Sequence, residues 1–249
     1  MKKLVVSGCS FTFEEWNWPT YVAQYLGLGL DSITNVGMGS QGNELIAKKA
    51  IYAVTEELKH FPAEQLLVGI MWSGPDRFAF YSEDVYDSKN WGNNRAVVKI
   101  HNPTNIGNGS PKKWYILNPG WDGLPGGPEV GYYYYRYFHS NIGARIATLE
   151  SILLTQWFLQ EKGVRYFMTT YMDIFEKHDS SLWSHPDLKY LYDLVDFSKF
   201  LPTVGCYEYL KENFPEGVPA VEGIHPYESG HKYFANHCII PFLQDRFNL

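Results

Sequence analysis

The sequence predicts an α/β protein whose parallel sheet is covered by helices on both faces. Short apolar runs alternate along the chain with segments in which apolar residues recur every three or four positions. Alternating strands and helices are typical of a parallel sheet. The 249 residues, 45% of them hydrophobic, are enough for a substantial core. Because no internal repeat or linker is evident, we expect one domain over residues 1–249.

Four short apolar runs are the expected strands, and they cover residues 3–7, 33–36, 66–72 and 164–170. Strands buried on both faces of a sheet read as continuous apolar runs of this kind. Helical periodicity predicts helices at residues 18–26, 46–58, 141–161, 188–197 and 229–239. Glycines end the first and third of these helices, and Pro241 marks the expected end of the last.

Residues from about 82 to 137 interrupt this rhythm. The segment is rich in Gly, Pro and Asn, and it contains Trp91, Trp114, Trp121 and a run of tyrosines at 132–135 and 137. A loop of this length inside a domain is usually functional or disordered, and the aromatic content argues against disorder. We therefore expect an insertion that folds over the functional site. If the tyrosine run is a strand, every second ring faces that site.

Charge and cysteine content exclude several classes of protein. The net charge is −6 and no basic stripe is present, which argues against nucleic acid and anionic membranes as partners. The three scattered cysteines, Cys9, Cys206 and Cys238, form neither a disulfide framework nor a zinc pattern. Only three apolar residues follow Lys2-Lys3 before Ser7, too few for a signal peptide, and no run is long enough to span a bilayer. We expect a cytoplasmic or otherwise soluble protein, whose oligomeric state the sequence leaves open.

Ser10 and His225 are the candidate nucleophile and base. Ser10 follows the first expected strand, and α/β sheets bind their ligands at the carboxyl ends of their strands. Glu222 lies three residues before His225, so its carboxylate can accept from one ring nitrogen and leave the other free to take the serine proton. The three side chains are the parts of a nucleophile, base and orienting acid.

With these residues the chain resembles the SGNH (GDSL-type) hydrolases, a superfamily of esterases and lipases with a flavodoxin-like three-layer fold. The family's first block, Gly-Asp-Ser-x-Thr/Ser, resembles residues 8–12, with Cys9 in place of Asp. Its last block, Asp-x-x-His-Pro followed by Gly-His, resembles residues 222–226 with Gly230-His231, and Glu222 replaces Asp. The resemblance implies Ser10 as nucleophile, His225 as base and Glu222 as orienting acid.

The inner blocks match less closely. The second, Asn-x-Gly-x-x-Gly, resembles residues 35–40, with Ser40 where the oxyanion glycine belongs and Gly39 one position early. The third, Gly-x-Asn-Asp, falls at residues 72–75 and lacks its asparagine, with Ser73 as the nearest replacement. The resemblance implies an oxyanion hole of the backbone N–H groups of Ser10 and of Gly39 or Ser40, with Ser73 as a third donor. Loss of one such donor costs roughly 10²–10³ in rate.

An aromatic content of 17% favours a ligand that stacks on rings, such as a sugar. We therefore expect a serine esterase that acts on an acylated carbohydrate, for instance an O-acetyl ester. The expected substrate contacts are Trp72, Arg77, Trp121 and Tyr133. We expect no metal and no organic cofactor.

Three alternatives remain open. The same residues can transfer an acyl group to a sugar instead of water, and the scaffold can bind or assemble glycans without catalysis. Residues 37–42 also spell Gly-x-Gly-x-x-Gly between a strand and a helix, the fingerprint of dinucleotide binding. That fingerprint expects an acid about 20 residues on, at the end of the next strand. Glu56 and Glu57 fall in the expected helix instead, so the hydrolase reading is favoured.

Overall fold

A computed structural model describes residues 1–13, 15–82, 113–118, 129–175, 182–219 and 225–249. Its centre is a sheet of four parallel strands in the order β2-β1-β3-β6. The strands are β1 (Lys3–Gly8), β2 (Ile33–Asn35), β3 (Leu66–Trp72) and β6 (Arg165–Thr170). A single parallel bridge from Met168 to Phe200 extends the sheet beyond β6. All four expected strands are present.

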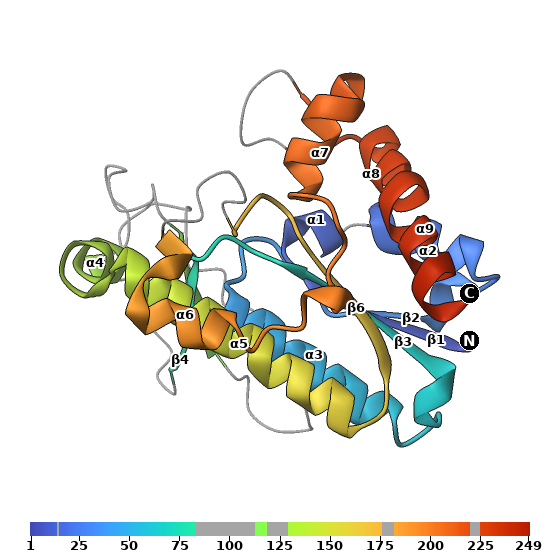
Figure 1. Ribbon diagram of the computed structural model, residues 1–249, viewed down its shortest axis with the longest axis horizontal. Coiled ribbons are helices and arrows are strands. Elements are labelled where there is room, and N and C mark those ends of the chain that lie inside the picture. Colours follow the sequence, from blue (N-terminus) through green and yellow to red (C-terminus); the bar gives the residue numbers. More distant parts are fainter. Residues whose placement is uncertain (14, 83–112, 119–128, 176–181, 220–224) are drawn as a thin grey trace.

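Helices cover both faces of this sheet, which confirms the predicted fold class and gives the three layers that the resemblance implies (Figure 1). One face packs against α3 (Asn43–Glu57), α5 (Asn141–Glu161) and α6 (Pro186–Tyr192). The other packs against α2 (Trp18–Tyr25), α7 (Cys206–Asn213), α8 (Glu228–Phe234) and α9 (Ile240–Phe247). None of the described helices has the length and apolar character needed to cross a membrane.

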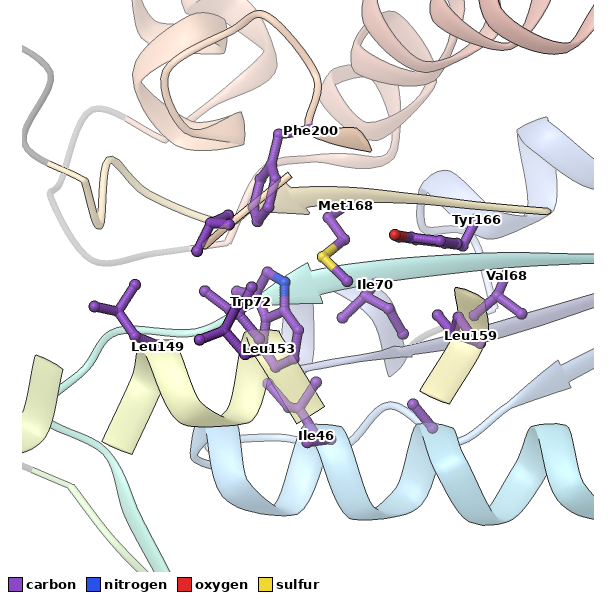
Figure 2. Packing of buried hydrophobic residues seen from close by; sticks show 14 of the residues in the cluster. Ile46, Val68, Ile70, Trp72, Leu149, Leu153, Leu159, Tyr166, Met168 and Phe200 are labelled. Atoms are coloured by element: carbon purple, nitrogen blue, oxygen red, sulfur yellow. The ribbon is translucent and has the colours of Figure 1, made fainter. Parts of the chain in front are cut away.

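The two cores share the strands, because successive side chains of a strand point to opposite faces. Val68, Ile70 and Trp72 of β3 pack with α3 and α5, as Figure 2 shows, whereas Leu67 and Met71 face α2 and α9. All are fully buried, as the apolar run of β3 predicts.

The described part of residues 82–137 forms regular structure beside α3. Strands β4 (Phe78–Ser82) and β5 (Lys113–Leu117) form a two-stranded antiparallel sheet, and Ala79 and Ile116 pack with Met38 and Leu45. Helix α4 (Glu129–Tyr133) continues into the π-helical segment η4 (Tyr134–Phe138). The tyrosine run is therefore helical and not a strand. Trp91 and Trp121 lie outside the described residues, so the expected cover over the site stays a prediction.

Two helix predictions need correction. The last helix does not end at Pro241: α8 runs through the π-helical segment η8 (Ala235–Ile239) into α9, and the proline occupies the first turn of α9. Proline fits a first turn because it lacks the N–H group, and a π-helical turn changes the local hydrogen-bond register. The helix expected at 188–197 is shorter and begins earlier, at Pro186, which likewise lies in its first turn.

Candidate active site

Ser10 and His225 are in direct contact, although 215 residues separate them. The distance from His225 Nε2 to Ser10 Oγ is 2.5 Å, shorter than an ordinary hydrogen bond between nitrogen and oxygen, so the two atoms are in direct polar contact. Ser10 begins the short helix α1 (Ser10–Phe13), just after β1 reaches the carboxyl edge of the sheet. His225 precedes α8, on the face of the sheet opposite α3. The structure therefore brings the two predicted residues together.

Close packing fixes the turn that carries Ser10. A Cβ atom on Gly8 would overlap the Thr12 hydroxyl and lie 2.9 Å from the Met71 carbonyl oxygen, so the position excludes larger residues. Asn17 Nδ2 donates to the Ser10 carbonyl oxygen at 2.9 Å, and Trp18 Nε1 donates to Thr12 Oγ1 at 3.2 Å. The start of α2 thus holds α1 against the end of β1.

Rings pack beside His225 on the α8 side. The Phe11 ring centroid lies 5.2 Å from that of His225 and 6.0 Å from that of His231. His231 is only 1% exposed. Burial, with a smaller contribution from nearby His225, lowers its pKa to about 3. His231 is consequently a neutral neighbour of the base. Glu222 lies outside the described residues, so its role as the orienting acid stays a prediction.

The loop predicted to supply oxyanion donors is held against the same turn. Met38 N donates to the Gly8 carbonyl oxygen at 3.1 Å, and Gln41 Nε2 donates to the same oxygen. Ser40 has a φ of +68°, a left-handed conformation that reverses the loop. Within the described part of the chain, neither the Gly39 N–H nor the Ser40 N–H donates to a backbone acceptor. Both remain candidate oxyanion donors.

Asn43 connects α3 to the end of β3, and sequence reasoning missed it. Its Oδ1 accepts from Ser73 N at 2.8 Å, and its Nδ2 donates to the Ser73 carbonyl oxygen at 3.0 Å and to Thr148 Oγ1 at 3.0 Å. These partners lie 30 and 105 residues away in sequence, so no local motif identifies them. The side chain fixes Ser73 in the position where the family's third block falls.

Ser73 is fully buried, and its Oγ accepts from Arg77 Nη1 at 2.8 Å. The Arg77 guanidinium also lies over the ring of Tyr171, 4.8 Å from its centroid. Tyr171 in turn packs edge-on against Phe11 at 5.1 Å. Arg77 is thus linked through two rings to the side of His225. A role for Ser73 in the oxyanion hole stays a prediction.

Among the described residues, the expected substrate contacts lie in different surroundings. Trp72 is fully buried in the core between α3 and α5 (Figure 2), so the expectation that it contacts substrate is wrong. The apolar run that predicts β3 extends through Trp72, and this run was the signal for burial. Tyr133 is 50% exposed on α4. Trp121 lies outside the described residues.

The dinucleotide alternative fits the structure poorly. A pyrophosphate binds to exposed N–H groups at a helix N-terminus. At the start of α3, however, Asn43 is buried against Ser73, and a Cβ on Gly42 would lie only 2.5 Å from the Arg77 carbonyl oxygen. The start of α3 is therefore packed against the backbone of Arg77 and Ser73.

Comparisons with known proteins complete this description. No family model and no curated protein sequence matches the chain. Among solved structures it is similar to YxiM of Bacillus subtilis, with 10% identity and a TM-score of 0.46 over 98% of this chain and 56% of that one. It is also similar to an acetyl xylan esterase, AlAXEase, with 15% identity and a TM-score of 0.42 over 94% and 96% of the two chains.

A third similar structure is an acetyl xylan esterase of the rumen bacterium Butyrivibrio proteoclasticus, with 12% identity and a TM-score of 0.41. The similarity covers 99% of this chain and 64% of that one. The chain thus spans less than two thirds of the length of two of the three structures. Similarities at these low identities and TM-scores say nothing about the activity of this chain.

Proposed function

We propose that the chain is a serine esterase that hydrolyses carboxylic esters through an acyl-enzyme. The contact between Ser10 Oγ and His225 Nε2 at 2.5 Å supports this proposal most directly. A serine hydroxyl is a weak nucleophile until a neighbouring base can take its proton. The contact lies at the carboxyl edge of the sheet, where α/β folds bind their ligands.

In the proposed reaction Ser10 Oγ attacks the ester carbonyl while His225 takes the hydroxyl proton. His225 then gives that proton to the leaving alcohol, and a water molecule releases the acyl group by the same route in reverse. Glu222 holds the other ring nitrogen and stabilises the charged imidazole. The oxyanion accepts from the backbone N–H groups of Ser10 and of Gly39 or Ser40.

The proposed substrate is an acyl ester on a carbohydrate, with an O-acetyl group as the simplest case. Exposed aromatic side chains support a ring-stacking ligand: Tyr133, Tyr137 and Phe138 are 50%, 63% and 77% exposed on α4 and η4. Tyr133 and Tyr137 also stack, with centroids 6.1 Å apart, so their exposed rings lie together. Transfer of the acyl group to a sugar instead of water requires the same residues.

Intact-mass spectrometry after treatment with a fluorophosphonate tests the proposal. Wild type and the control Ser229→Ala, which removes an exposed hydroxyl from α8, should each gain one adduct. Ser10→Ala should gain none, and His225→Ala should react on the order of 10⁴-fold more slowly because the serine loses its base. Turnover of a small acetate ester should follow the same order.

The absence of an adduct on folded wild type would contradict the proposal and favour a non-catalytic glycan-binding module. An adduct that persists in Ser10→Ala would place the nucleophile elsewhere. If wild type is labelled but releases its acyl group faster to a sugar than to water, the chain is an acyltransferase.

A further inference from the structure

A pocket lies between the first turn of α3, the residues after β3, the segment η4 and the start of α5. Its volume is about 230 Å³. Ligand sites for drug-sized molecules begin at about 300 Å³. The pocket therefore suits a compact ligand about the size of one sugar ring. Neither Ser10 nor His225 lines it.

One wall of this pocket is aromatic. The rings of Phe78 and Tyr134 are stacked, with centroids 4.3 Å apart and planes 8° from parallel. Phe138 also lines the pocket although its side chain is 77% exposed, so it lies at the pocket's rim. Because Phe78 and Tyr134 cover each other's facing sides, Phe138 at the rim is the ring most open to a ligand. An exposed aromatic ring offers apolar surface at little cost in conformational entropy, and the C–H face of a pyranose ring is a polar ligand that fits it.

Polar groups in the wall match the hydroxyl groups of a neutral sugar. Burial raises the pKa of the Glu44 carboxyl. Its Oε2 is buried without a hydrogen-bond partner among the described residues, an arrangement that costs free energy. The terminal torsion of Glu is broad, so the carboxyl can turn toward a ligand hydroxyl. Arg77 also lines the pocket, but its guanidinium is engaged by Ser73 Oγ and the Tyr171 ring, so the Glu44 carboxyl is the polar group that we assign to a ligand hydroxyl.

The pocket is rigidly attached to the sheet. Tyr135 Oη donates to the Asp76 carbonyl oxygen at 2.7 Å, and His139 Nε2 lies 3.1 Å from Asp76 Oδ1. These two bonds hold both ends of η4 against the residues that follow β3. The wall is therefore preformed, which lowers the entropy cost of binding.

Arg77 connects this pocket to the candidate active site. It lines the pocket, donates to Ser73 Oγ at 2.8 Å and packs over Tyr171, whose ring contacts Phe11 beside His225. In Figure 1, η4 follows α4 at the end of the molecule toward which the strands point, and this is also the edge that carries Ser10. Arg77 thus joins the pocket to the residues beside His225 through direct side-chain contacts.

We propose that the pocket between Glu44, Phe78, Tyr134 and Phe138 is a carbohydrate subsite that holds one unesterified pyranose unit of an oligosaccharide. The proposal deepens the proposed function, since it rests on a glycan ester as substrate. The subsite holds a unit distant from the esterified one, so longer chains bind more tightly than short ones.

Binding of unacylated oligosaccharides to Ser10→Ala protein tests the subsite without any catalysis. The probes are neutral β-1,4-linked hexasaccharides of xylose, glucose, mannose and N-acetylglucosamine, titrated by calorimetry and by NMR. We expect at least one to bind with a Kd in roughly the millimolar range or below. Phe138→Ala and Glu44→Gln, each in the Ser10→Ala protein, should weaken that binding at least about fivefold. Tyr190→Ala, which removes an exposed ring from α6, outside the pocket, should leave it unchanged.

Circular dichroism of each variant shows that it is folded; Phe138 is exposed, so its removal leaves the core intact. The subsite is overturned if no hexasaccharide binds, or if Phe138→Ala and Glu44→Gln both bind like the parent. These outcomes are separable from failure of the esterase. An enzyme that hydrolyses small esters but binds no hexasaccharide lacks the subsite, whereas a chain that binds one but fails fluorophosphonate labelling retains it.

Discussion

His231 illustrates how burial of one side chain makes stability depend on pH. Its folded-state pKa is lowered from 6.5 to about 3, chiefly by burial. Between these two values the unfolded chain binds a proton that the folded chain does not. The contribution of His231 to stability is therefore fully present above pH 6.5 and is lost as the pH falls toward 3.

We therefore predict that His231→Gln weakens the pH dependence of folding. Between about pH 7.5 and 5, protonation of His231 in the unfolded chain should lower the unfolding free energy of wild type by about 2 kcal/mol. The loss in the variant over the same pH range should be smaller by this amount. Urea denaturation at both pH values measures the difference. His60→Gln, at an exposed position, should keep the wild-type dependence. Equal pH dependence in wild type and His231→Gln would contradict the prediction.

Asn43 is a residue whose role depends wholly on long-range contacts. Its amide bonds to three groups: the N–H and the carbonyl oxygen of Ser73, just after β3, and the hydroxyl of Thr148 in α5. Buried polar groups without partners cost about 1–3 kcal/mol each. The third sequence block of the SGNH hydrolases, which this chain resembles, has an asparagine in the loop after β3. Here that loop lacks the asparagine, and Asn43 of α3 bonds to it instead.

At the scale of elements, the turn from β1 into α1 positions the nucleophile. It depends on Gly8, because a Cβ there would lie 2.9 Å from the Met71 carbonyl oxygen, which belongs to the rigid strand β3. Backbone cannot move aside as the end of a flexible side chain can. The strain therefore falls on α1 and on Ser10 two residues later.

We predict that Gly8→Ala destabilises the fold by about 1–3 kcal/mol, the usual cost of overpacking. Because Ser10 is displaced from His225, fluorophosphonate labelling should also slow by roughly 10²-fold. Gly74→Ala is the matched control: its nearest neighbour is the hydroxyl of Tyr171 at 3.3 Å, and its stability should change by about 0.5 kcal/mol or less. Wild-type stability and labelling rate in Gly8→Ala would refute this account of the turn.

The continuous run from α8 to α9 shows why local signals misplace element ends. Proline normally ends a helix because it lacks an N–H group and clashes with the preceding turn. In η8 the π-helical register places Pro241 in a first turn, where neither cost applies. Buried Phe234, Ile239 and Leu243 draw the whole segment against the sheet. Packing thus overrides the local stop signal.

At the scale of the whole molecule, two cores depend on one sheet. Trp18 of α2 lies in the core on one side of the sheet and Trp72 of β3 lies in the core on the α3 side, and both are fully buried. Gly69 of β3 makes this possible on the α2 side, because a Cβ there would lie 2.8 Å from the Trp18 ring. Because both cores use the same strands, loss of the helices from one face exposes strands on which the other core also depends.

We therefore predict that the chain unfolds as a single domain. Urea transitions followed by tryptophan fluorescence and by far-UV circular dichroism should coincide, as expected of a two-state transition. The reporters differ, since fluorescence follows buried rings such as Trp18 and Trp72 whereas circular dichroism follows the helices. Two separate transitions would instead indicate that one core unfolds before the other and would contradict a single domain.

The sequence by itself determined the strands, most of the helices and the layered arrangement of the fold. Apolar runs such as that of β3 and the periodicity of α5 are local, and burial on a sheet or helix face is their direct physical cause. Local turn chemistry also placed Ser10 at the end of β1. These features follow from neighbours within a few residues.

Only the tertiary structure decided which distant residues meet. The order β2-β1-β3-β6 brings Ser10 to His225 across 215 residues, joins Asn43 to Thr148 and buries Trp72 instead of offering it to a ligand. It also assembles Glu44, Phe78 and Tyr134 around one pocket. Such contacts depend on how all the layers pack together, and packing is a property of the whole chain that no short pattern encodes.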